Sequence, residues 1–199
     1  IGTREATDYG KKAGRKMAAT LAESGWCIFS GLAEGCDTVG HQGALDVGGK
    51  TVAILAHGFG KIYPASNKGL AVEIVEKGGC LVSEYPPGTP ATRGSFVQRD
   101  RLQSGLSQAI IVLETDVKGG TMHTVGFAEE QGRGIGTLSH PKQYLQEPKT
   151  QGNQMLINTS RAIPIANKED LLTFASNLDV SEESSEASDP STSQSNFNF

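Results

Sequence analysis

Cysteine is scarce in this chain of 199 residues, which has three: Cys27, Cys36 and Cys80. All of them lie in or beside apolar stretches, and none belongs to a C-x-x-C pair. The odd count argues against a disulfide framework and favours a reducing compartment, so we expect a cytoplasmic protein. No apolar run approaches the length of a membrane helix and no signal-peptide pattern opens the chain, so we expect no membrane association.

Motifs for metal binding and hydrolysis are also missing. The histidines show no H-x-x-H or H-E-x-x-H spacing, and the chain has no G-x-S-x-G elbow. Gly49-Lys50-Thr51 resembles the end of a Walker A loop, but Ala44 stands where the first glycine of that loop belongs, and a strand is expected where a helix is required. We therefore expect no metal, no cofactor and no catalytic residues.

The chain also lacks an excess of positive charge. The chain has 18 Lys and Arg residues against 22 Asp and Glu residues, a formal net charge of -4. The stretch from residue 177 onward contains five of the acidic residues and no Lys or Arg, so the rest of the chain is close to neutral. A neutral body can bind nucleic acid only if its positive charge is concentrated in one groove.

Strand and helix patterns alternate along the chain. Apolar runs predict strands at residues 26–29, 51–55, 80–82, 109–113, 134–138 and 162–165. Segments between them predict helices, including a polar helix at roughly residues 97–104, and a proline in the last run predicts an edge strand. Such alternation builds βαβ units, so we predict an α/β fold with a mostly parallel sheet and helices on both faces.

We expect one folded domain at residues 1–176. Its opening residues, Ile1-Gly2-Thr3, read as the end of a strand, which predicts that the first strand is clipped at the N-terminus. Residues 177–199 are rich in serine and acidic residues, and we expect them to form a disordered tail.

The most informative stretch is SGLAEGCD, from Ser30 to Asp37, directly after the apolar run at residues 26–29. A strand that enters a glycine-rich turn and then a helix presents backbone N–H groups at a helix N-terminus, which usually makes a phosphate site. His41, four residues after Asp37, is expected to bond to it and fix the helix start. The motif alone does not distinguish a small nucleotide from a nucleic acid.

Other candidate ligands for a phosphate lie near the same edge of the predicted sheet, where the carboxyl ends of parallel strands meet. The turn Lys118-Gly119-Gly120-Thr121 allows close backbone approach, and the hydroxyls of Thr121 and Thr124 can donate. Arg4 follows the first strand. Lys50 either points to a ligand at the sheet edge or is solvated.

The polar helix carries two more cations. Arg99 and Arg101 lie two positions apart, so they diverge on a helix and at most one of them faces the site. The other is expected to pair with an acid such as Asp100 or Glu114. Phe96, just before them, is either a core residue or a surface on which a base can stack.

Six motifs in this order resemble the DNA-processing protein A family, also called DprA or Smf. They are Gly2-Thr3-Arg4, Ser30 to Asp37 with His41, Gly48 to Thr51, Tyr63-Pro64, Ser83 to Gly88, and the block from Phe96 to Ser107. The match covers roughly residues 1–175. The resemblance implies an extended Rossmann-like three-layer fold, a homodimer and no catalysis. It also implies binding of single-stranded DNA, with loading of the recombinase RecA in homologous recombination or natural transformation.

The resemblance, together with the reading of the residues, gives a set of expected DNA- and phosphate-binding residues. They are Arg4, Ser30, Gly31, Gly35, Lys50, Phe96, Arg99, Arg101, Gly119, Gly120, Thr121 and Thr124. The family's usual block reads FPxRNRIIAGLS, whereas residues 96–107 read FVQRDRLQSGLS. Asp100 therefore replaces an asparagine and adds negative charge beside the expected groove.

Two alternatives stay open. One is a Rossmann-type nucleotide-binding protein or a nucleoside-monophosphate hydrolase of the lysine-decarboxylase-like group. That group carries Pro-Gly-Gly-x-Gly-Thr-x-x-Glu, of which this chain matches Gly119-Gly120. Phe127 stands where an acid is needed, and no paired catalytic carboxylates are evident. The other is a sensor that binds a small nucleotide signal on the same edge.

Overall fold

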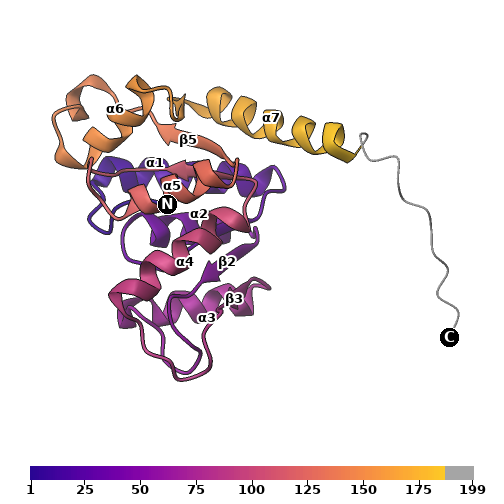
Figure 1. Ribbon diagram of the computed structural model, residues 1–199. Helices are drawn as coiled ribbons and strands as arrows, with labels where there is room; N and C mark the ends of the chain where they lie inside the picture. Colours follow the sequence, from indigo (N-terminus) through magenta and orange to yellow (C-terminus); the bar gives the residue numbers. More distant parts are fainter. Residues whose placement is uncertain (187–199) are drawn as a thin grey trace, which may run out of the picture.

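The computed structural model describes residues 1–186 and confirms the α/β architecture (Figure 1). The strands are β1 (Ile28–Ser30), β2 (Thr51–Ile54), β3 (Cys80–Val82), β4 (Ala109–Val112), β5 (Gly134–Leu138) and β6 (Ile163–Ile165). The α-helices are α1 (Asp8–Glu23), α2 (Cys36–Asp46), α3 (Lys68–Glu76), α4 (Arg93–Gly105), α5 (Thr121–Glu130), α6 (Gln151–Asn158) and α7 (Lys168–Glu186).

The strands form two parallel sheets, in the orders β1-β2-β3 and β4-β5-β6. Ile28 is in register with Thr51 in the first sheet, and Ala109 with Gly134 in the second. Pro164 lies in β6, which is an edge strand as predicted. Figure 1 shows β2, β3 and α3 at one end of the molecule and β5, α6 and α7 at the other.

Each sheet has its own apolar core. Every residue of β2 is buried, and Ala53 packs with Leu32, Leu55 and Ile74 on the first sheet. The second sheet packs against α5 and α6 through residues such as Leu156, which is fully buried. Full burial of one such leucine or isoleucine contributes about 1.5–3 kcal/mol to the free energy of unfolding, so the two cores hold the ends of the strands in place.

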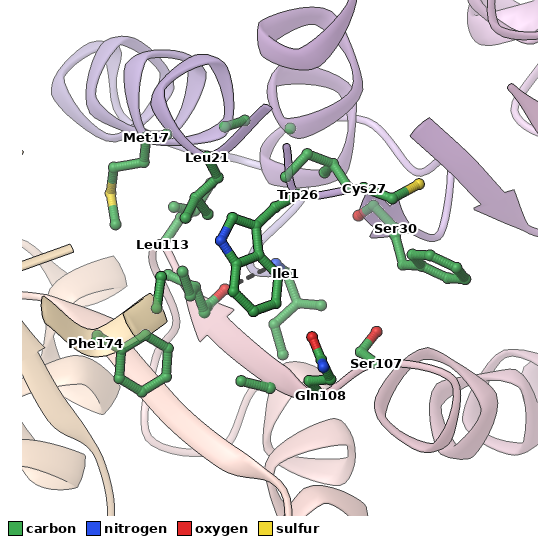
Figure 2. Close-up of a pocket in the computed structure, with 18 of the residues that line it drawn as sticks. Ile1, Met17, Leu21, Trp26, Cys27, Ser30, Ser107, Gln108, Leu113 and Phe174 are labelled. Atoms are coloured by element: carbon green, nitrogen blue, oxygen red, sulfur yellow. Dashed lines mark hydrogen bonds between the residues drawn. The ribbon is translucent and has the colours of Figure 1, made fainter. Parts of the chain in front are cut away.

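A cavity of about 300 Å³ separates the two sheets, between β1 and β4 (Figure 2). Its lining is largely apolar and includes Trp26, Leu113 and Phe174. Residues 1–3 run beside β4: the amino group of Ile1 donates to the carbonyl of Ile111, and the N–H of Leu113 donates to the carbonyl of Ile1, both at 2.9 Å. This placement fits the end of a strand, and the clipped first strand stays a prediction.

Two boundaries differ from the predicted ones by more than two residues. Helix α4 begins at Arg93, earlier than residue 97, because Thr92 and Ser95 form a reciprocal capping box. The tail was expected from residue 177, but α7 continues through Glu186. The remaining residues of the predicted tail, 187–199, lie outside the described part of the chain.

Candidate nucleic-acid interface

A pocket of about 370 Å³ lies where β4 and β1 end, and we call it the strand-end pocket. Its walls come from residues 1–5, the loop after β1, one face of α4 and the loop that leads into α5. The predicted residues that line it are Arg4, Phe96, Arg99, Gly119, Gly120, Thr121 and Thr124. A smaller pocket of about 40 Å³ shares Arg4, Ala33 and Phe96 with it and includes Gly31.

Glu114, at the end of β4, anchors the loop that carries Arg4. Its backbone carbonyl accepts the N–H of Thr3 at 2.7 Å, and its carboxylate accepts the N–H and hydroxyl of Thr7 at 2.7 and 2.6 Å. His140 Nε2 lies 3.3 Å from the same carboxylate. Burial raises the pKa of Glu114, but the hydrogen bonds from His140 and Thr7 outweigh it and leave the pKa below its ordinary value. Arg4 is therefore exposed on an anchored loop.

Arg4 and Phe96 form the rim that the two pockets share. The Arg4 guanidinium lies 5.0 Å from the centre of the Phe96 ring, within the range of a cation–π contact. Tyr63, which lines the smaller pocket, extends this rim: its ring centre lies 5.6 Å from that of Phe96, and it is 49% exposed. The rim thus offers a cation beside two aromatic rings that are accessible to a ligand.

The N-terminus of α5 forms another wall of the strand-end pocket. Gly119, Gly120 and Thr121 line it, and the helix has no side-chain cap at Gly120. Met122 and His123 donate to the carbonyls of Gly119 and Gly120, each at 3.0 Å, so among the described residues the N–H groups of Gly120 and Thr121 are the ones left for an anion. The predicted role of this turn in approaching a phosphate is compatible with its position.

Arg99 is only 5% exposed and serves the protein itself. Its Nη1 donates to the carbonyls of Gly31 and Ile54, each at 2.7 Å, and its Nε donates to Asp100 at 3.2 Å. A guanidinium that bridges two strand ends in this way cannot also turn its Nη1 to a phosphate. Arg99 thus lines the pocket and also pairs with Asp100, whereas Arg101, expected to pair with an acid such as Asp100 or Glu114 if it did not face the site, pairs with Glu84.

The turn at residues 31–35, which we call the Gly31 turn, is packed against this guanidinium. A Cβ on Gly31 would lie 2.0 Å from Arg99 Nη1, so the glycine makes room for the arginine. The N–H of Ala33 donates to Asp37 at 3.2 Å. The predicted hydrogen bond between Asp37 and His41 is absent, so that prediction is wrong: His41 Nδ1 contacts the Thr51 hydroxyl at 2.7 Å instead.

Four predicted residues lie away from the strand-end pocket. Lys50 precedes β2 and donates to the carbonyl of Lys77 at 2.9 Å, so it lies at the amino end of the sheet and not at the edge where the pocket opens. Arg101 pairs with Glu84. Ser30 lines the cavity between the sheets. Gly35 packs behind the pocket, where a Cβ would lie 2.4 Å from the carbonyl oxygen of Arg4.

The pocket also holds residues that were not predicted to bind DNA or phosphate. Asp37 and Asp100 both line it. Burial raises the pKa of Asp100 to about 6, Arg99 opposes that rise and Asp37 adds to it. Gln103 follows Asp100 and Arg99 by three and four positions, and this helical spacing could have predicted that it lies on the same face of the helix. Lys149, 3.3 Å from Glu5, comes from a distant 3₁₀ turn and gave no signal.

Within residues 1–186, no group of three or more His, Cys, Asp or Glu side chains is suited to hold a metal ion, and no helix is long and apolar enough to cross a bilayer.

Comparisons with known proteins agree with this arrangement. Residues 1–176 match the family model of DNA recombination-mediator protein A. The protein Smf of Escherichia coli is 38% identical over 172 residues, which are 86% of this chain and 45% of that protein. The chain thus spans about half the length of the curated relatives that it matches.

Solved structures of the family superpose well. The DNA processing protein A of Streptococcus pneumoniae gives a TM-score of 0.78 at 31% identity, over 87% of this chain and 59% of that one. The Helicobacter pylori protein, described for its single-stranded DNA binding mode, gives 0.79 at 29% identity, over 89% of this chain and 79% of that one. The chain belongs to the DNA recombination-mediator protein A family.

Proposed function

We propose that this chain binds single-stranded DNA across the rim of the strand-end pocket, as a mediator of recombination. The observation that carries the proposal is the Arg4–Phe96–Tyr63 rim, with the guanidinium 5.0 Å from one ring and the two rings 5.6 Å apart. Proteins that bind single strands without sequence preference combine cations for the phosphates with aromatic rings for the bases. The rim has both within one nucleotide's length.

Two other features support the proposal. The N-terminus of α5 has no side-chain cap and offers the N–H groups of Gly120 and Thr121 to a second phosphate, in the same pocket as Arg4. The relative from Helicobacter pylori is described as binding single-stranded DNA, and it superposes on 89% of this chain. A strand that passes from the rim to α5 would cross the mouth of the strand-end pocket.

Fluorescence anisotropy with a labelled dT oligonucleotide tests the proposal. We expect Phe96→Ala to weaken binding about tenfold, the lower range for one base stacked on an aromatic ring. Arg4→Ala should weaken binding and lower the slope of log K against log salt by about 0.7, the value for one phosphate contact on a single strand. Lys50→Ala is the matched control, a cation removed from the far end of the sheet, and should change neither value.

The absence of binding at low salt would overturn the proposal, and so would equal losses in Arg4→Ala and Lys50→Ala. Incubation with nucleoside monophosphates separates this function from hydrolysis, since binding alone predicts no release of free base.

Loading of a RecA-type recombinase and homodimer formation are implied by the family resemblance. Assembly of recombinase filaments on coated DNA, and sedimentation of the chain alone, test these two predictions.

A further inference from the structure

One face of α4 brings two polar side chains into the strand-end pocket. Asp100 and Gln103 are three positions apart, which makes them neighbours on a helix, and both line the pocket. The Asp100 side chain is 14% exposed, and Gln103 is 4% exposed. Both positions differ from the family's usual block, which has asparagine and isoleucine there.

Gln103 has an unused hydrogen-bond donor. Its side-chain Nε2 is buried and has no hydrogen-bond partner among the described residues. A buried amide without a partner is costly, and most buried polar groups in proteins are satisfied. An acceptor atom on a ligand in the pocket would provide that partner.

Asp100 supplies the complementary acceptor. Its Oδ1 accepts from Arg99 Nε at 3.2 Å, and a carboxylate has two oxygens with about four acceptor sites, so Asp100 can accept further N–H donors. The ionisable groups that act on it are Arg99, Asp37 and His123. Arg99 already donates to two carbonyls, and Asp37 is an acceptor like Asp100. A ligand in the pocket can therefore supply a second donor to Asp100.

We propose that Asp100 and Gln103 form a base-recognition site that favours guanine over thymine, an inference that rests on the proposed binding of single-stranded DNA. Guanine offers N1–H and N2–H₂ side by side, which match the two oxygens of a carboxylate, and its O6 accepts from an amide such as that of Gln103. Thymine offers a single N3–H between two carbonyls, so one carbonyl oxygen would face the carboxylate. The pocket, at about 370 Å³, lies in the size range of small-molecule sites.

Competition binding tests the site. A labelled dT oligonucleotide is displaced by unlabelled strands of the same length in which one thymine, at each position in turn, is replaced by guanine. We expect the best guanine strand to compete about tenfold better than the thymine strand, the range for one bidentate base contact. In Asp100→Asn and in Gln103→Leu the ratio should fall to about two or less.

Asp8→Asn is the matched control, because it makes the same charge change on the outer end of α1, where Asp8 is exposed. It should keep the tenfold ratio. Equal competition by guanine and thymine strands in the unmodified chain would overturn the inference. So would an equal gain in affinity for both strands in Asp100→Asn, which would make Asp100 a source of phosphate repulsion only. Thermal unfolding shows whether each variant is folded.

Mononucleotides distinguish failure of this inference from failure of the proposed function. Binding of dGMP over dTMP, lost in Asp100→Asn and measured by NMR, supports the base site even if no oligonucleotide binds. In that case the DNA-binding proposal falls and the base site stands. Oligonucleotide binding without any base preference overturns the base site and leaves the DNA-binding proposal standing. Absence of both kinds of binding overturns both.

Discussion

The Gly31 turn and the strand-end pocket lie beyond strand ends, carry glycines and were both expected to bind phosphate, but they are built differently. The Gly31 turn is filled from within, because Arg99 donates to the Gly31 carbonyl from 68 residues away in the chain. The strand-end pocket is open, and a Cβ on Gly120 would have no atom of the described residues within 4 Å. A glycine after a strand therefore marks a close approach, and the approaching group can be a side chain of the protein itself.

The largest effect expected from this comparison is on Arg99. Arg99→Ala should lower the free energy of unfolding by about 4 kcal/mol, because two charge-assisted hydrogen bonds are lost and two buried carbonyls lose their partner. Arg101→Ala removes an exposed ion pair with Glu84 and should cost less than about 1 kcal/mol. Urea unfolding measures both, and similar costs for the two variants would show that Arg99 does not hold the turn.

A glycine-to-alanine substitution in the Gly31 turn and one in the strand-end pocket sharpen the comparison between the two. Gly31→Ala puts a methyl group 2.0 Å from Arg99 Nη1 and should cost about 2–3 kcal/mol, since the guanidinium has to leave its carbonyl partners. Gly120→Ala meets open space and should stay within about 0.5 kcal/mol. Thermal or urea unfolding distinguishes them, and a tolerated Gly31→Ala would mean that the Gly31 turn has spare room.

The pH dependence of stability compares His41, a buried base near the Gly31 turn, with Asp100, a buried acid in the strand-end pocket. Burial lowers the pKa of His41 to about 4, so the unfolded chain binds its proton first and stability falls as pH drops from 7 to 5. Burial raises the pKa of Asp100 to about 6, so the folded chain binds that proton first and stability rises over the same range. The two effects nearly cancel in the unmodified chain.

Asp100→Asn removes one side of this balance. Between pH 7 and pH 5 the variant should lose about 2 kcal/mol of stability, whereas the unmodified chain should lose less than about 1 kcal/mol. Urea unfolding at several pH values measures the difference. Carboxylates with a lowered pKa, such as Glu114, lose their contribution at lower pH and do not enter this window. Parallel curves for the two proteins would contradict the assignment of the opposing proton to Asp100.

Much of the fold could be predicted from local pattern. The apolar runs gave every strand of the described residues to within two residues, and the proline of β6 correctly indicated an edge. Local signals act over a few residues, so they determine elements and caps well. Asn167, for example, caps α7 as an asparagine before an apolar helix should, by accepting the N–H of Asp170 at 3.0 Å.

The candidate site was harder to predict because it depends on contacts across the chain. Phe96 and Arg4 meet only in the folded protein, and Arg99 faces inward because two strand-end carbonyls need a donor. Lys50 is different, since its position before a strand already places it at the amino end of a parallel sheet. Its exclusion from the edge that carries the pocket could have been read from the sequence.

The most direct test of the account is an amide NMR titration of the ¹⁵N-labelled chain with a short single-stranded oligonucleotide. If DNA crosses the strand-end pocket, the largest shift changes will be at Phe96, Gly119 and Gly120, and the amide of Lys50 will not move. Shift changes centred on Lys50 and Lys77, with none at Gly119 and Gly120, would contradict it.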